Sequence, residues 1–91
     1  MRHLFIVDPL PGLNPEADTS VVFMRDAARR GHEVATCGVG DLSVRPGGRA
    51  QASWVAIRAR EGRDWYTLGA SGSSELSAFD VVWMRKDPRT T

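Results

Sequence analysis

The sequence predicts an α/β fold with a small, mostly parallel sheet, one main crossover helix and a β-hairpin excursion. An apolar run at residues 4–7 is followed by a loop, an amphipathic segment and a second short, partly β-branched run at residues 32–37. This order and tight spacing are typical of a right-handed βαβ unit with parallel strands. Further along, Pro46-Gly47-Gly48 separates two extended segments, which indicates a hairpin.

Size and composition are those of one folded domain, expected over residues 1–91. The chain is 42% hydrophobic and 25% charged, with a net charge of +1 that would not attract nucleic acid or an anionic membrane. The single Cys37 cannot form an intrachain disulfide, which favours a reducing compartment. No apolar run approaches the ~20 residues of a membrane span, and the first is too short for a signal peptide. We therefore expect a cytoplasmic protein without a membrane partner.

The first half of the chain gives the clearest signals. Residues 4–7 are all apolar, as in a strand buried on both faces, and Asp8-Pro9 ends them. Three prolines, a glycine and an asparagine make residues 8–17 a surface loop. Asp18-Thr19-Ser20 are N-cap residue types, and Gly31 can end the helix in the left-handed conformation. Apolar residues recur on one face of this helix, at Val21, Val22, Met24, Ala27 and Ala28.

The second half predicts weaker elements. Residues 42–45 and 49–60 form the hairpin, and the small and polar residues of its second arm indicate an exposed ribbon. Residues 65–68 could be a third short strand, followed by a loose loop of small residues at 69–74. Residues 75–79 allow at most one helical turn before the apolar run at 81–84, which predicts a buried strand.

Charged residues follow this last strand directly. Ligands in open α/β sheets bind at the carboxyl ends of strands, which makes Arg85-Lys86-Asp87-Pro88 the first candidate site. Arg85 offers a planar fork of donors and Lys86, the one lysine of the chain, a point charge. Together they could bind a carboxylate or a phosphate. The alternative is a turn in which Asp87 pairs with one of the cations, and the residues alone favour neither.

Other candidate residues predict no chemistry of their own. His3 and His32 are expected to serve in packing or at the surface rather than in catalysis or metal binding. Cys37, at the end of an apolar strand, is expected to be an inert small hydrophobe. Gly38-Val39-Gly40 lacks the third glycine and the helix of a nucleotide-binding fingerprint, and the loop at 8–17 has no lysine. We expect no cofactor to be bound by this chain.

A basic hairpin is the rival interpretation. Arginines of the hairpin region lie near aromatic residues, and such pairs can stack single-stranded bases. The residues concerned are Arg45, Arg49, Arg58, Arg60 and Arg63, with Trp54, Trp65 and Tyr66. A solvated hairpin with aromatic packing beneath it explains the same pattern, and we expect no nucleic-acid partner.

Several motifs together resemble a known family. They are Asp8-Pro9, Asp18-Thr19-Ser20, residues 28–33, Gly40-Asp41-Leu42 and residues 80–88. In the same order and near the same spacing, they resemble the N-terminal domain of bacterial glutathione synthetase. The string Met84-Arg85-Lys86-Asp87-Pro88 is the specific part, whereas the arginine-glycine helix end occurs in many βαβ units. The chain departs from the family at Arg89, where the family usually has a second proline after Asp87-Pro88.

The resemblance implies a Rossmann-like, pre-ATP-grasp domain on the substrate side of a ligase. The full enzyme joins γ-glutamylcysteine to glycine through an acyl phosphate made from ATP, with magnesium. Its ATP and metal ligands lie in a later ATP-grasp region, so the chain alone should be inactive. The resemblance implies that the peptide substrate is contacted by Asp18, Ser20, Arg85, Lys86 and Asp87.

Partners follow from the same resemblance. We expect a peptide such as γ-glutamylcysteine or glutathione, and an ATP-grasp partner chain. A stand-alone binding or regulatory module for γ-glutamyl thiols is the alternative. The sheet is expected to be incomplete, and because open strand edges tend to pair with other chains, we also expect a homo-oligomer.

Overall fold

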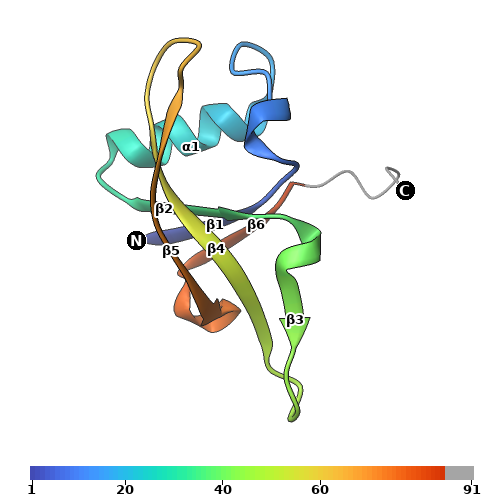
Figure 1. Cartoon of the computed structure of the whole chain (residues 1–91). Coiled ribbons are helices and arrows are strands. Elements are labelled where there is room, and N and C mark those ends of the chain that lie inside the picture. The colour runs from blue at the N-terminus through green and yellow to red at the C-terminus, as the bar shows by residue number, and fades with distance from the viewer. Residues whose placement is uncertain (86–91) are drawn as a thin grey trace.

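Six strands and one α-helix make up residues 1–85, the part of the chain that the computed structural model describes (Figure 1). The strands are β1 Arg2–Ile6, β2 Glu33–Cys37, β3 Leu42–Val44, β4 Ala50–Ala59, β5 Tyr66–Glu75 and β6 Val81–Met84. The helix is α1 Thr19–Arg29, and short 3₁₀ turns span Leu10–Gly12, Val39–Asp41 and Leu76–Ala78. The predicted α/β class is confirmed, with one sheet and one α-helix.

The predicted βαβ unit is present. β1 and β2 are parallel, in register from Arg2 opposite Glu33 to Ile6 opposite Cys37. α1 begins at Asp18, whose carboxylate accepts a hydrogen bond of 2.8 Å from the backbone N–H of Ser20. Past its end, Gly31 has φ +78°, the left-handed conformation that glycine adopts without strain.

The sheet is mixed, so the expectation of a mostly parallel sheet is not confirmed. Its strand order is β3-β4-β2-β1-β6, with β5 also paired to β4. β1 is parallel to both β2 and β6, whereas β4 is antiparallel to β2, β3 and β5. The reason is the length of β4, because one end pairs with β3 in the predicted hairpin and the other continues along β2, where Ile57 lies opposite Val34.

Two expectations for the hairpin region are wrong. β4 is not an exposed ribbon, since it lies inside the sheet and buries Ala52 and Ile57. Residues 69–74 are not a loop, because β5 runs through them along β4. Small side chains permit this pairing: a Cβ at Gly72 would lie 2.8 Å from the ring of Trp54 on β4. Local composition indicated a loop, and cross-strand packing determined a strand.

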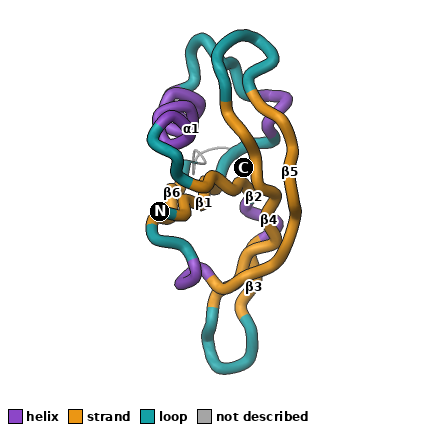
Figure 2. Tube along the Cα trace, turned by 90° about the vertical axis from the view of Figure 1, so that its left-hand side faces the viewer, coloured by secondary structure: helices purple, strands orange, loops and turns teal. Residues whose placement is uncertain are grey.

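Both faces of β1 are buried, as its apolar run predicted. Phe5 faces α1 and packs with Val21 and Met24, whereas Leu4 and Ile6 face the other way into a cluster with Ala52 and Phe79. Figures 1 and 2 show the long β4–β5 hairpin arching past the β1–β2–β6 ribbon, with α1 near one end of the arch. The two core clusters therefore lie on opposite faces of β1.

β6 is an edge strand and not the fully buried strand that its sequence predicted. It pairs in parallel with β1, from His3 opposite Val81 to Ile6 opposite Met84. Val82 is 40% exposed and Met84 60% exposed, because no described strand lies beyond them. Among the described residues, no helix combines the length and the apolar character needed to cross a membrane.

Candidate functional site

Arg85 connects the end of the sheet to the start of the helix. Its backbone N–H donates to the carbonyl of Ile6 at 2.9 Å, which extends the β6–β1 ladder by one residue. Its side-chain Nε donates to the hydroxyl of Ser20 at 3.2 Å. The guanidinium carbon lies 5.4 Å from the centre of the Phe23 ring, a cation–π distance. These contacts fix the guanidinium at the carboxyl edge of the sheet.

The structure brings three of the five predicted site residues together. Ser20 is buried in the first turn of α1 and accepts from Arg85. Asp18 is partly buried at the N-cap, where its carboxylate is bonded to the N–H of Ser20. The same residue that caps the helix therefore orients the residue that Arg85 contacts. Lys86 and Asp87 lie outside the described residues.

This arrangement can bind an anion. The Arg85 side chain is exposed, and within residues 1–85 its two terminal nitrogens make no hydrogen bond. A guanidinium held through Nε and stacked on a ring keeps its Nη donors for a carboxylate or phosphate, in paired geometry. The start of α1 adds a partial positive charge to the same place.

A cavity of about 860 Å³ opens beside this edge of the sheet. It lies between the loop that follows β1 and the β4–β5 hairpin, and its lining includes Val7, Asp8, Cys37, Trp54 and Tyr66. Its link to Arg85 runs along β1, because the carbonyl that Arg85 binds belongs to Ile6, which precedes the lining residue Val7. Sequence reasoning missed this cavity, since the curl of the hairpin that forms one wall has no local signal.

The thiol in this cavity is not a nucleophile. Cys37 is buried, and burial together with the nearby Asp41 carboxylate raises its pKa to about 11. It therefore stays protonated at neutral pH, whereas a reactive cysteine needs a stabilised thiolate. This agrees with the expectation of an inert cysteine.

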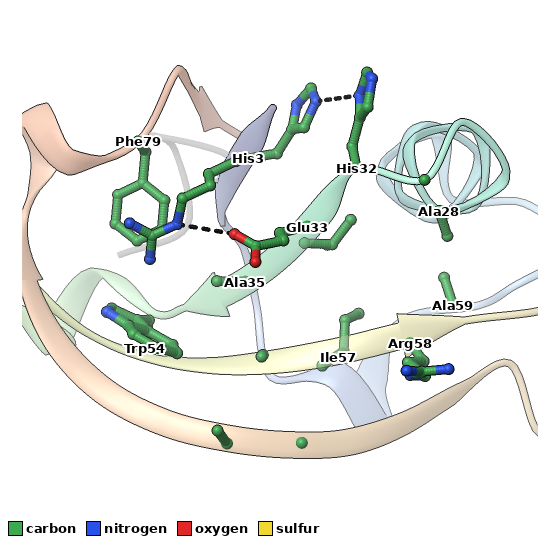
Figure 3. Close-up of a pocket in the computed structure, with 16 residues that line it drawn as sticks. His3, Ala28, His32, Glu33, Ala35, Trp54, Ile57, Arg58, Ala59 and Phe79 are labelled. Carbon is green, nitrogen blue, oxygen red and sulfur yellow. Dashed lines mark hydrogen bonds and ion pairs between the residues drawn. The ribbon is translucent and has the colours of Figure 1, made fainter.

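A second cavity, of about 710 Å³, lies at the opposite end of the parallel strands (Figure 3). Arg2 lies beside it with its Nε 3.1 Å from a carboxylate oxygen of Glu33 and its guanidinium carbon 4.8 Å from the centre of the Phe79 ring. His3 and His32 are joined by a 3.0 Å hydrogen bond between ring nitrogens. His3 is buried, as expected for a packing histidine.

Two features of the described residues bear on metal binding and nucleic-acid binding. Within residues 1–85 no group of three or more His, Cys, Asp and Glu side chains could hold a metal ion. In the hairpin region Trp65 is 2% exposed and Trp54 packs against Gly72 and Phe79. The arginines are partly paired, as in the 2.8 Å contact of Arg60 with Asp64. Aromatic packing under a solvated hairpin, the alternative to base stacking, fits these contacts.

Comparison with known proteins points to one family. The family model described as "Prokaryotic glutathione synthetase, N-terminal domain" matches residues 1–91. The glutathione synthetase of Gloeobacter violaceus is 51% identical over 92 residues, which cover 100% of this chain and 28% of that protein. Those of Parasynechococcus marenigrum and Bordetella pertussis are each 38% identical over 97% of this chain, which corresponds to 27% and 29% of their own lengths.

The chain thus spans a little over a quarter of the curated relatives it matches. The match takes in Asp18, Ser20 and Arg85, which the fold brings together, and the segment that carries Lys86 and Asp87. The resemblance noted in the sequence is therefore confirmed along the whole chain, and the chain belongs to the family of prokaryotic glutathione synthetase N-terminal domains.

Proposed function

We propose that this chain forms the substrate-side lobe of a glutathione-synthetase-like ligase, with Arg85 binding a carboxylate of γ-glutamylcysteine. One observation carries the proposal. The guanidinium is held at the carboxyl edge of the sheet by Ser20 and Phe23, while its terminal nitrogens stay unbonded within residues 1–85. Family membership supports the identity of the peptide, and the geometry supports the residue that would bind it.

The other predicted residues would assist in different ways. Ser20 would orient the guanidinium, and Asp18 would hold Ser20 through the helix cap, so that both act behind Arg85. We propose that Lys86 and Asp87, next along the chain, also contact the peptide, the ammonium as a partner for a carboxylate and the Asp87 carboxylate as an acceptor from an N–H group. A bidentate contact with Arg85 would fix the direction of the peptide toward the reacting carboxyl group.

ATP and magnesium would bind in the part of a glutathione synthetase that this chain does not match. In support of this assignment, no group of three metal-ligand side chains within residues 1–85 could hold a metal ion, and the sequence has no phosphate-binding loop. The lobe would therefore bind and orient the peptide, and an ATP-grasp region would carry out the phosphoryl transfer. We propose that the chain alone forms no glutathione.

We also propose that the domain is a variant of the Rossmann-like, pre-ATP-grasp fold. The three mutually parallel strands, in the order β2-β1-β6, and the crossover helix α1 are the elements such a fold requires. The antiparallel β3, β4 and β5 would be an addition to this unit. A cytoplasmic location fits a ligase that uses ATP.

A hybrid enzyme tests the proposal. The matching N-terminal region of the Gloeobacter violaceus relative is replaced by this chain, and glutathione formation is followed with ATP, magnesium, γ-glutamylcysteine and glycine. The hybrid should form glutathione and the 91-residue chain alone should not. In the hybrid, Arg85→Ala should raise KM for γ-glutamylcysteine more than for glycine. A well-folded hybrid in which Arg85→Ala leaves that KM unchanged would remove Arg85 from the site.

A further inference from the structure

A stack of aromatic rings lies between α1 and the β1–β6 pair. At its centre, Trp83 is nearly parallel to Phe5, with an interplanar angle of 2° and a centroid distance of 5.4 Å. Trp83 also stacks on Phe23 of α1 at 5.1 Å and on His3 of β1 at 6.2 Å. A ring with neighbours on all these sides has little freedom to turn.

Hydrogen bonds fix the protonation state of the stack. The indole Nε1 of Trp83 lies 3.0 Å from Nδ1 of His3. Because an indole nitrogen only donates, Nδ1 of His3 must be the acceptor and carries no proton. The neutral ring then has its proton on Nε2, which donates to Nδ1 of His32 at 3.0 Å. A chain of two hydrogen bonds therefore runs from Trp83 through His3 to His32.

The same stack supports the candidate substrate-binding arginine. Phe23, which Trp83 contacts on one side, lies beneath the guanidinium of Arg85 at 5.4 Å. Arg85 follows Trp83 by two residues in the chain and continues the hydrogen-bond ladder of the same strand. A shift of the indole would therefore disturb Arg85 twice, through the ring beneath its guanidinium and through the strand that carries it.

We propose that Trp83 and His3 are positioning residues for Arg85. The bond from the indole to the uncharged imidazole holds the ring stack on which the guanidinium lies, and a proton on Nδ1 of His3 would face the indole N–H and break that bond. The consequence for peptide binding rests on the function proposed above. The coupling between His3 and Arg85 is independent of that function.

The surroundings of His3 keep it neutral. Burial lowers its pKa, and the neighbouring His32 ring and the amino group of Met1 lower it further, whereas Asp80 acts in the opposite direction. These are the titratable groups that face His3 from the turn before β2, from the chain start and from the turn before β6. At pH 7 the ring stack is therefore in its hydrogen-bonded form, and it opens under more acidic conditions.

Nuclear magnetic resonance of the 91-residue chain tests the coupling. In ¹⁵N-labelled protein at pH 7, His3 should be the Nε2–H tautomer. As the pH falls, the Trp83 indole N–H and the Arg85 Nε–H signals should both change at the pH where His3 titrates. Trp83→Phe keeps a ring and removes the donor, so the pKa of His3 should rise and the Arg85 Nε–H should exchange faster.

Two further variants keep the test decisive. Trp54→Phe removes a comparable indole hydrogen bond, 3.1 Å to the hydroxyl of Ser74, and should leave the Arg85 signal unchanged. Phe23→Leu removes the ring that lies under Arg85 and stacks on Trp83, but it leaves both partners of the indole hydrogen bond in place. If Trp83→Phe does not fold, the pH titration of the unaltered chain still tests the coupling. An Arg85 Nε–H signal that is insensitive to His3 titration and to both ring variants would overturn the proposal.

Calorimetry with γ-glutamylcysteine separates the positioning of Arg85 from its role in substrate binding. Trp83→Phe should weaken binding about fivefold, the order expected for one neutral hydrogen bond. If the resonance coupling holds but Arg85→Ala leaves the affinity unchanged, positioning stands and the substrate role of Arg85 fails. If Arg85→Ala abolishes binding while Trp83→Phe and Phe23→Leu have no effect, the substrate role stands and positioning fails.

Discussion

Arg85 and Ser20 are 65 residues apart in the chain, yet Nε of Arg85 donates to the hydroxyl of Ser20 across 3.2 Å. The contact exists because β1 is the shared neighbour of both elements: α1 follows it in the chain, and β6 pairs with it. The end of the described chain and the start of its helix thus meet at the carboxyl edge of the sheet. Ligands of open α/β sheets bind at this edge.

Arg85→Ala should weaken the binding of γ-glutamylcysteine by the 91-residue chain at least about tenfold, because a charge-assisted contact is lost. Arg85→Lys should retain part of the affinity, since a point charge cannot reproduce a paired contact. Titration calorimetry measures both. Arg63→Ala, which removes another exposed arginine of residues 1–85, is the matched control and should bind as the unaltered chain does.

Stability should rise with pH around the titration of His3. Its folded-state pKa lies below the ordinary value of 6.5, so the unfolded chain binds more protons near and below pH 6.5. The stabilising contribution of neutral His3 is therefore complete above pH 6.5 and is lost as pH falls through the lower, folded-state pKa. Urea unfolding midpoints between pH 5 and 8 measure this contribution to stability. His3→Gln, which keeps an acceptor but does not titrate, should reduce the dependence of stability on pH. An equally steep dependence would show that other groups cause it.

Gly72→Ala should destabilise the fold by about 1–3 kcal/mol, the usual cost of overpacking. The added Cβ would lie 2.8 Å from the Trp54 ring, which also bonds to Ser74 and cannot turn away freely. Gly40→Ala is the control, because a Cβ at Gly40 meets nothing within 4 Å. Thermal or urea unfolding compares the two, and equal losses of stability would show that Trp54 moves aside.

Cys37 should react slowly with thiol reagents at pH 8 in the folded chain. Its pKa of about 11 leaves well under 1% thiolate, and the side chain is buried. The unfolded chain should react at the ordinary rate of an exposed cysteine. Absorbance assays with a disulfide reagent, with and without urea, give the ratio of the reaction rates in the unfolded and folded chains. Equally fast reaction in both states would contradict the buried thiol.

The edge formed by β6 should promote self-association of the 91-residue chain. Val82 and Met84 are exposed along it, and an unprotected edge can pair with another chain. Sedimentation velocity should show a mass that increases with concentration. Val82→Lys should reduce the association, and Val22→Lys, on the exposed side of α1, should not. A single monomeric species at all concentrations would refute an open pairing edge.

Local sequence patterns correctly predict the elements whose signals lie in adjacent residues. The apolar run of β1, the cap at Asp18 and the glycine at Gly31 mark the βαβ unit, because burial on both faces and helix ends each need particular residue types in adjacent positions. The family motifs likewise identify the chain, and the resemblance that they carry predicts Arg85 and Ser20 as site residues.

How these elements combine depends on contacts between segments that are far apart in the chain. β4 is the centre of a mixed sheet and residues 69–74 are a strand because Gly72 can lie against Trp54, a contact between segments that no local pattern encodes. The two hydrogen bonds that connect Trp83 to His3 and His3 to His32 likewise join three parts of the sequence. Sequence patterns report what neighbouring residues favour, whereas register and packing between distant segments depend on the complementarity of whole surfaces.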